Sequence, residues 1–328
     1  MICEHEDKVF STDEANFEQR AVELFHFQYQ HNPVYNQYVN SLPIVGAAVR
    51  RLADIPFLPI QCFKTHTIKT TEFEAEAVFE SSGTTGSVNS RHYVKDLGLY
   101  KQSFGKAFER FYGAVEDWCV IGLLPSYLER QHSSLVVMVD ELIRQSRHEA
   151  SGFYLYEHEK LAVVLQQLEA RGQKTLLIGV TFALLDFAEK YPLALRHTVV
   201  METGGMKGRR EEITRQQVHD ILKAAFHLPA IHAEYGMTEL LSQAYAAGAG
   251  ILQCPPWMKV LVREEDDPFA IHHAGSGVLN VIDLANMYSC SFIATEDVGR
   301  VYPDGSFEVQ GRMDNSDIRG CSLMVVGL

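Results

Sequence analysis

The sequence predicts an α/β fold of layered, mainly parallel sheets flanked by helices, with a small β-rich subdomain near the C-terminus. Strand-length apolar runs alternate with amphipathic segments of helical period over most of the chain, which is typical of parallel βα units. Beyond residue 250 this pattern changes to short strands separated by turns. The length of 328 residues is enough for one large domain with subdomains or for two domains.

The N-terminal part is predicted to be a helix followed by an irregular connection. Apolar residues recur at helical spacing from Phe17 to Tyr29, after the candidate cap Thr12. Asn32-Pro33 is predicted to end this helix. Residues 43–70 contain prolines and show little periodicity, so we expect a long connection there.

The alternating region follows this connection. We expect strands at 74–80, 117–125, 174–180 and 198–205, and helices at 96–112, 133–147, 158–171, 181–192 and 210–226. The strands predicted for the β-rich subdomain are 276–284, 290–302 and 305–313.

Charge and composition exclude several classes of protein. The formal net charge of −13 argues against broad nucleic-acid binding, which needs a basic surface. The longest apolar runs have strand length, and the N-terminus lacks the features of a signal peptide. The six cysteines are scattered without a C-x-x-C pair, so a zinc cluster is not expected. A cytoplasmic protein with free thiols is the prediction.

The stretch FESSGTTGSVNSRHYV, residues 79–94, contains an unbroken run of small hydroxyl and glycine residues. Glycines let the backbone approach a ligand closely, consecutive N–H groups bind anions, and hydroxyls add neutral donors. Such a loop suits a polyphosphate, but the lysine of a Walker A loop is missing, so a P-loop NTPase is excluded. A flexible surface turn is the alternative. The loop comprises Ser81, Ser82, Gly83, Thr84, Thr85 and Gly86.

Three downstream segments follow this loop in a characteristic order. They are TGGMKG at 203–208, AEYGMTE at 233–239, and ATEDVGRVYPDGSFEVQGRMDNSDIRG at 294–320. Together with SSGTTG they resemble the adenylate-forming (ANL) superfamily of acyl-CoA synthetases, luciferases and peptide-synthetase adenylation domains, over roughly residues 75–321. The resemblance implies the fold of that superfamily's N-terminal domain. Within it, LLPSYLERQHSSLVVMVDELI and DIRGCSLM are similar to the LuxE-type acyl-protein synthetases.

The resemblance also implies a nucleotide site. Loop 81–86 would hold the β- and γ-phosphates of ATP, with Thr85 among the catalytic residues. Glu239 would bind Mg²⁺, and Asp297 would accept hydrogen bonds from the ribose. The other implied nucleotide-binding residues are Gly204, Gly205, Tyr235, Gly236, Thr238 and Arg312, and the candidates for orienting the substrate carboxylate are Tyr127, Arg130 and His132, of which the histidine could also be structural.

Structural roles are open alternatives for the implied site residues. Glu239 could stabilise the N-terminus of a helix that begins there. Asp297 could be an ordinary turn aspartate, and Glu296 stands where the superfamily has glycine, which adds bulk and charge. Arg312 could pair with a surface carboxylate, and Tyr235 could pack in the core.

The adenylate-forming domain is expected to span residues 1–310, with 250–310 as the β-rich subdomain and 311–328 as a hinge-like tail. The superfamily continues into a small C-terminal domain that carries an assisting lysine. Because the sequence ends eight residues after Gly320, we expect this domain to be missing. Candidates to replace its lysine are Lys64, Lys69, Lys95 and Lys207.

Cys321 lies in the tail. The LuxE-type enzymes that this chain resembles carry a cysteine near the C-terminus, and that cysteine receives the acyl group as a thioester. An acceptor must be an accessible thiolate, and Arg312 and Arg319 could lower its pKa. The alternative is a small buried apolar residue, which is common for a free cysteine.

The expected function is ATP-dependent activation of a carboxylic acid, with a fatty acid as the expected substrate, to acyl-AMP, followed by transfer to Cys321. The resemblance implies ATP and Mg²⁺ as cofactors and an acyl-CoA reductase (LuxC-like) or another acyl acceptor protein as partner. A carboxylate–CoA ligase resembling phenylacetate-CoA ligase is a second hypothesis. A non-catalytic nucleotide- or acyl-binding subunit is a third.

Overall fold

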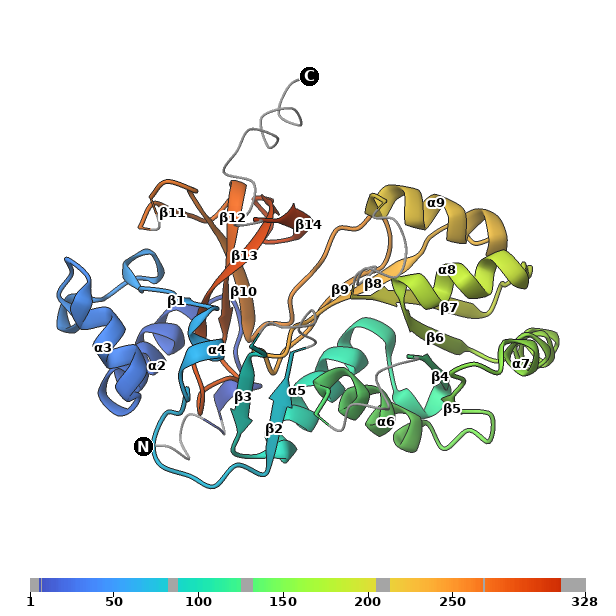
Figure 1. Ribbon diagram of the computed structural model, residues 1–328, viewed down its shortest axis with the longest axis horizontal. Helices are drawn as coiled ribbons and strands as arrows, with labels where there is room; N and C mark the ends of the chain where they lie inside the picture. Colours follow the sequence, from blue (N-terminus) through green and yellow to red (C-terminus); the bar gives the residue numbers. More distant parts are fainter. Residues whose placement is uncertain are drawn as a thin grey trace, which may run out of the picture.

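The computed structural model describes residue 6 and residues 8–81, 88–124, 132–204, 213–267 and 269–313. Figure 1 shows two large sheets beside each other, with the N-terminal helices against one and the remaining long helices around the other. Several residues singled out in the sequence lie outside the described ranges, namely Ser82, Gly83, Thr84, Thr85, Gly86, Tyr127, Arg130, Gly205, Lys207, Arg319 and Cys321.

The N-terminal helix begins later than predicted. Helix α2 spans Phe17–His31 and has Asn16 at its N-cap. The Thr12 hydroxyl instead donates to the Val9 carbonyl at 2.6 Å, so the prediction that Thr12 caps this helix is wrong. Asn32 ends α2 and also begins α3 (Pro33–Ser41), because its side chain accepts a hydrogen bond from the Tyr35 N–H.

The connection that follows contains only short elements. They are the 3₁₀ turns η1 (Gly46–Ala48) and η2 (Leu52–Asp54), strand β1 (Leu58–Pro59) and helix α4 (Cys62–Thr65). A two-stranded hairpin comes next, made of β2 (Ala77–Glu80) and β3 (Arg91–Val94), and loop 81–86 belongs to the segment 81–90 that joins its strands.

The first large sheet has the order β5-β4-β6-β7-β8-β9 and is parallel except for its last pair. Its strands are β4 (Cys119–Leu123), β5 (Gly152–Phe153), β6 (Thr175–Val180), β7 (Thr198–Thr203), β8 (His232–Tyr235) and β9 (Ala244–Ala246). Every residue of β4 and β6 is buried, which is expected of a parallel sheet covered on both faces.

Helices cover both faces of this sheet. Figure 1 shows α8 and α9 on one side of it and α5 and α6 on the other. Side chains at their N-termini fix several starts: Asp96 caps α5, Ser133 caps α6, and Thr214 forms a capping box with Gln217 in α9. The helices are α5 (Leu97–Tyr112), α6 (Ser134–Ser146), α7 (His158–Ala170), α8 (Thr181–Lys190) and α9 (Arg215–Phe226).

The second large sheet is antiparallel except for β1, which pairs parallel with β13. The first sheet confirms the predicted mainly parallel sheet flanked by helices, and the second contains the β-rich region predicted after residue 250. A hairpin meander needs no crossover helices, so this sheet forms from consecutive short strands. Its order is β1-β13-β12-β10-β11, with β14 beside β13; the remaining bounds are β10 (Met258–Arg263), β11 (Ile271–His272), β12 (Gly275–Asp283), β13 (Phe292–Val301) and β14 (Phe307–Arg312).

Buried hydrogen bonds join the segment after β8 to the end of β12. The Asp283 carboxylate accepts from the N–H groups of Leu241 and Ser242 at 2.8 and 2.9 Å, and from the Ser242 hydroxyl at 2.6 Å. The Asn286 side-chain amide donates to the Glu239 carbonyl at 2.7 Å. These bonds hold residues 239–242 against the antiparallel sheet. None of the helices in the described parts of the chain combines the length and apolar composition that a membrane span requires.

Candidate functional site

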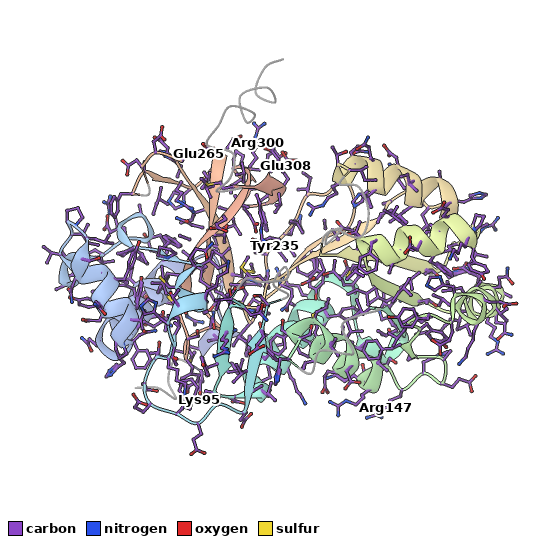
Figure 2. The ribbon with its side chains drawn as sticks, in the orientation of Figure 1. Lys95, Arg147, Tyr235, Glu265, Arg300 and Glu308 are labelled. Carbon is purple, nitrogen blue, oxygen red and sulfur yellow. The ribbon has the colours of Figure 1, made fainter. Side chains whose placement is uncertain are left out.

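A cluster of polar side chains lies where the two large sheets meet. Tyr235 ends β8 of the first sheet, whereas Asp297 and Arg312 lie on β13 and β14 of the second. The Tyr235 hydroxyl donates to Asp297 Oδ2 at 2.8 Å, and Arg312 Nε donates to Oδ1 at 3.1 Å. Figure 2 shows Tyr235 between the sheets. Three residues implied by the sequence resemblance are therefore brought together.

The register of the antiparallel sheet explains the ion pair, because Asp297 and Arg312 are direct partners across β13 and β14. The Asp297 side chain is 9% exposed and that of Arg312 is 67% exposed. Burial lowers the pKa of Arg312, but the charge of Asp297 and its hydrogen bond raise it overall. Asp297 is buried and lies within a strand, so it is neither a turn aspartate nor a surface carboxylate paired with Arg312. Those two alternatives are therefore wrong.

Tyr235 has a packing role as well. Its ring makes an edge contact with Phe307, with centroids 5.3 Å apart. Burial, followed by the charge of Asp297, raises the pKa of Tyr235 well above its ordinary value, so the phenol stays protonated and remains a donor. Tyr235 therefore packs in the core and also donates a hydrogen bond to Asp297.

Glu296 does not intrude on this cluster. Successive side chains of a strand point to opposite faces, so Glu296 faces away from its neighbour Asp297. Its carboxylate accepts from Gln61 Nε2 at 2.6 Å, on the side of the 43–70 connection. The bulk added by glutamate in place of glycine therefore lies outside the polar cluster.

Glu239 lies in a turn after β8, so the expectation that a helix begins at Thr238-Glu239 is wrong. Its residue is 4% exposed. Burial raises the pKa of Glu239, whereas a hydrogen bond from the Ser90 side chain and the charges of Arg312 and Lys64 lower it. A buried carboxylate without a direct ion-pair partner among the described residues would gain from a bound cation.

The base of the hydroxyl–glycine loop lies beside Glu239. The Ser81 N–H donates to the Ser90 carbonyl at 3.1 Å, and the Ser90 N–H donates to Ser81 Oγ at 2.9 Å. These bonds close the hairpin at Ser81 and Ser90. Because Ser90 also hydrogen-bonds Glu239, the loop that the sequence implies for phosphates starts next to the carboxylate implied for the metal.

Neutral His92 fixes the backbone of this turn. Its Nδ1 lies 2.8 Å from the Thr238 carbonyl, and burial lowers its pKa to about 4. At neutral pH the ring is uncharged and donates from Nδ1. Thr238 is thus held through its carbonyl.

Two glycines of the site occupy places that need them. A Cβ on Gly236 would lie 2.4 Å from Glu234 Oε1, so any larger residue there would have to displace the buried Glu234 carboxylate. Gly204 has a φ of +71°, and its carbonyl accepts from the Thr181 hydroxyl at 2.7 Å. Both lie just beyond the carboxyl ends of parallel strands, where α/β sheets commonly bind ligands.

Of the remaining residues singled out in the sequence, His132 and Lys64 lie near the loop or Glu239, whereas Lys69 and Lys95 make contacts elsewhere. His132 is exposed, and its carbonyl accepts from the Glu80 N–H at 2.9 Å, next to the loop. Among the described candidate lysines, Lys64 is the one whose charge acts on Glu239. Lys69 donates to the Phe73 carbonyl, and Lys95 lies over the Tyr288 ring, away from Tyr235 in Figure 2.

Two buried carboxylates near the site were not singled out from the sequence. Glu234 precedes Tyr235, accepts a hydrogen bond from the Thr203 hydroxyl, and has its pKa raised to about 7 by burial and by the charge of Glu202. Glu202 lies 3.0 Å from Arg215 Nε. The available signal for Glu202 was a charged residue inside the predicted strand 198–205, whereas Glu234 lay in a segment that was not predicted to be a strand.

No family model matches the chain. The long-chain-fatty-acid–luciferin-component ligase of Vibrio harveyi is 23% identical over 326 residues, covering 91% of this chain and 84% of the relative. A 2-hydroxyisobutyryl-CoA ligase in complex with 2-HIB-AMP and CoA superposes with a TM-score of 0.63 at 10% identity, over 94% of this chain and 78% of that one.

A second solved structure, an ATP-bound RpMatB–BxBclM chimera, has a TM-score of 0.56 at 16% identity over 75% of this chain. The alignment spans about half of the chimera, 49% of its length. The chain has the α/β fold of the adenylate-forming enzymes, and its resemblance to the LuxE-type acyl-protein synthetases is confirmed over most of its length.

Proposed function

We propose that this protein activates a carboxylic acid with ATP as acyl-AMP and then transfers the acyl group to a cysteine thiol. The observation that carries the proposal is the convergence of three features between the sheets. These are the base of loop 81–86, the buried Glu239, and the Tyr235–Asp297–Arg312 cluster. The name of the curated relative supports a long-chain fatty acid as the substrate.

In the first step a carboxylate oxygen attacks the α-phosphorus of ATP. The new P–O bond replaces the bond to the bridging oxygen, and pyrophosphate leaves with that electron pair. Residues 81–86 would hold the β- and γ-phosphates, and Asp297 would accept from the ribose hydroxyls. Gly204, Gly205 and Gly236 would leave room for the nucleotide. Catalysis of this kind depends on positioning and on stabilising charge.

The residues present fit Mg²⁺. Among the described residues no group of three or more His, Cys, Asp or Glu side chains could hold a metal alone. Mg²⁺ bound to a nucleotide needs only one or two carboxylates, because phosphates and waters supply the other ligands. Glu239 would be that carboxylate. When bound, the ion would neutralise phosphate charge; Glu239 itself would orient the ion toward loop 81–86.

In the second step the Cys321 thiolate attacks the acyl carbonyl carbon of acyl-AMP. A C–S bond forms, the bond to the phosphate oxygen breaks, AMP leaves with its electron pair, and the thiol proton passes to solvent. Residues 1–310 would form the adenylating domain, and residues 311–328 would form the hinge-like tail that carries this thiol. An acyl-CoA reductase (LuxC-like) or another acceptor protein would then receive the acyl group.

A carboxylate–CoA ligase is the second candidate function. It is favoured by the structural likeness to a ligase whose complex contains CoA. In that case CoA, and not Cys321, would attack the acyl-AMP.

Two measurements test these proposals. Acid-dependent pyrophosphate release with a panel of fatty and aryl acids tests adenylation, and its absence with every acid contradicts an enzymatic role. Intact-protein mass spectrometry after incubation with ATP and acid tests the thioester. We expect an acyl adduct that hydroxylamine removes and that Cys321→Ala abolishes. Acyl-CoA formation without any adduct would support the ligase instead.

A further inference from the structure

A large cavity lies on the opposite face of the antiparallel sheet from the polar cluster. Its volume is about 680 Å³, within the range of small-molecule sites. Residues 38–61 form one wall, and β10, β11 and β13 form the other. Glu296 lines it, whereas the adjacent Asp297 faces Tyr235. The cavity is therefore separate from the proposed nucleotide site.

The rim of this cavity is apolar and exposed. Val45, Phe269 and Met313 are 70%, 43% and 36% exposed, and all three line the cavity. The described residues include only seven large apolar side chains with such exposure. Exposed apolar residues that gather around one opening are typical of a site for an apolar ligand.

The charged side chains that line the cavity favour an uncharged ligand. Asp54 and Glu296 are its carboxylates, and Asp54 is already paired with Arg51 at 2.8 Å. The cation, Arg263, donates to the carbonyls of Leu279 and Thr295 and to Asn280 Oδ1. A fatty-acid anion would meet two negative groups and an arginine whose donors are largely in use. An acyl ester or thioester carries no charge and avoids this repulsion.

The chain passes from one site to the other at the end of β14. Arg312 contacts Asp297 on the nucleotide side, and the next residue, Met313, lines the cavity. The Met313 N–H donates to the Glu296 carbonyl at 2.7 Å, which holds this crossing point against β13. Cys321 follows eight residues later, so an extended connection of at most about 28 Å places its thiol within reach of either face.

We propose that this cavity holds the hydrocarbon chain of the acyl group while it is carried as a thioester on Cys321. The inference rests on the proposed function, because the second step described above supplies the thioester. Burial would remove each methylene from water and would keep the thioester near the protein, away from hydroxide and other nucleophiles. The cavity would thus store the activated acyl group until the acceptor protein takes it.

The test uses two cavity variants and one matched control. Ala294→Phe fills the cavity from β13, and Val45→Asp places a charge on its rim. Val163→Asp makes the same change at a valine of α7 that is 48% exposed and does not line the cavity. Circular dichroism and melting temperature check that each variant folds; because Val45 is exposed, Val45→Asp serves if Ala294→Phe does not fold.

Two readouts are compared on the full chain. The first is binding of the long-chain S-acyl thioester of N-acetylcysteamine without ATP, measured by competition with a fluorescent lipid. We expect at least tenfold weaker binding to both cavity variants and unchanged binding to Val163→Asp. The second is the hydroxylamine sensitivity of the adduct on Cys321, which we expect to rise several-fold in the cavity variants. Acid-dependent pyrophosphate release should stay within twofold of wild type.

Two results would overturn the inference while leaving the proposed function intact. One is unchanged thioester binding and adduct sensitivity in both cavity variants. The other is a raised KM for the free acid in the pyrophosphate assay, which would make the cavity the substrate site of the first step. Absence of pyrophosphate release from the wild-type chain would overturn the proposed function separately, and the ATP-free binding assay would still report on the cavity.

Discussion

Asp297 connects three strands through its two carboxylate oxygens. One oxygen accepts from Tyr235 of the parallel sheet and the other from Arg312 of the antiparallel sheet. Glu239 differs, because its nearest cations act on it only through space and Ser90 is its hydrogen-bond partner. The first carboxylate is therefore compensated within the protein, whereas the second has the larger gain from a bound cation.

Replacing Glu239 by Gln should slow adenylation far more than it weakens folding. The proposed role of the carboxylate is electrostatic, so we expect pyrophosphate release to fall about 100-fold or more. The melting temperature should change little or rise, because glutamine removes the cost of burying a charge. Activity is measured by pyrophosphate release and stability by thermal unfolding. A loss of activity in proportion to a loss of melting temperature would contradict this role.

Glu234 should make the stability of the protein fall as the pH rises. Its folded pKa of about 7 lies above its ordinary pKa of 4.5, so the folded state binds more protons between these values. The free energy of unfolding should decrease from about pH 4.5 to pH 7 by up to about 3 kcal/mol from this group.

Glu234→Gln isolates this contribution. His92 acts in the opposite direction, because its folded pKa of about 4 lies below its ordinary pKa of 6.5. The measurement is therefore the difference between variant and wild-type urea unfolding at each pH. The variant should be equally stable near pH 4.5 and relatively more stable at pH 7.5. A constant difference across this range would show that Glu234 does not titrate there.

At the scale of the elements, hydrogen bonds from Asp283 hold the turn that carries Glu239. The carboxylate at the end of β12 accepts hydrogen bonds from the N–H groups of Leu241 and Ser242. These two residues lie between β8 and β9, outside the strands of the parallel sheet. Burial raises the pKa of Asp283, whereas these hydrogen bonds lower it. The hydrogen bonds to Asp283 could not be predicted from the local sequence around residues 237–242.

Asp283→Ala should destabilise the protein by about 3 kcal/mol or more. The substitution leaves three buried N–H groups, those of Leu241, Ser242 and Ala285, and the Ser242 hydroxyl without their acceptor. We expect a lower urea midpoint and impaired pyrophosphate release, since the Glu239 turn loses its support. Asp304→Ala, at an exposed turn, is the control. Wild-type stability of Asp283→Ala would contradict this account.

Long elements could be predicted well from the sequence, and short ones could not. The predicted segments 96–112, 174–180 and 181–192 match α5, β6 and α8 closely because each carries a sustained apolar period. Strands β8 and β9 were not predicted, since four- and three-residue strands hold too little pattern. Thr238-Glu239 has the composition of a helix start, but the bonds to His92 and Asn286 hold a turn.

At the scale of the whole molecule, the proposed site exists only because two sheets meet. Tyr235 and Asp297 are 62 residues apart in the chain and 2.8 Å apart through their side chains. The order of the superfamily-like segments indicated that these residues act together. The contact between them depends on how the antiparallel sheet docks against the parallel one. The domain boundaries at 310 and the roles of residues 82–86 and Cys321 stay predictions.

Binding of ATP with Mg²⁺ should stabilise the folded chain, because a ligand held between both sheets binds only when they are docked. At 100 times the Kd the expected gain is about 2.7 kcal/mol. Asp297→Asn should lose at least tenfold in ATP affinity, since the ribose acceptor and its ion pair with Arg312 are both altered.

Thermal shift against ATP concentration measures both effects. Asp304→Asn, on an exposed turn, should bind ATP like the wild type. An unshifted melting temperature of the wild type at millimolar ATP and Mg²⁺ would contradict nucleotide binding between the sheets. Equal shifts for wild type and Asp297→Asn would instead remove the aspartate from the site.

The sequence by itself determined the alternation of helices and strands, the change to a β-rich region after residue 250, and the set of polar segments in order. These are local properties, because apolar period and turn chemistry act over a few residues. Only the tertiary structure decided that Glu296 faces away from Asp297, that Ser90 links the loop to Glu239, and that Met313 opens onto a cavity. Those outcomes depend on strand register and sheet docking, which are set by burial across segments far apart in the chain.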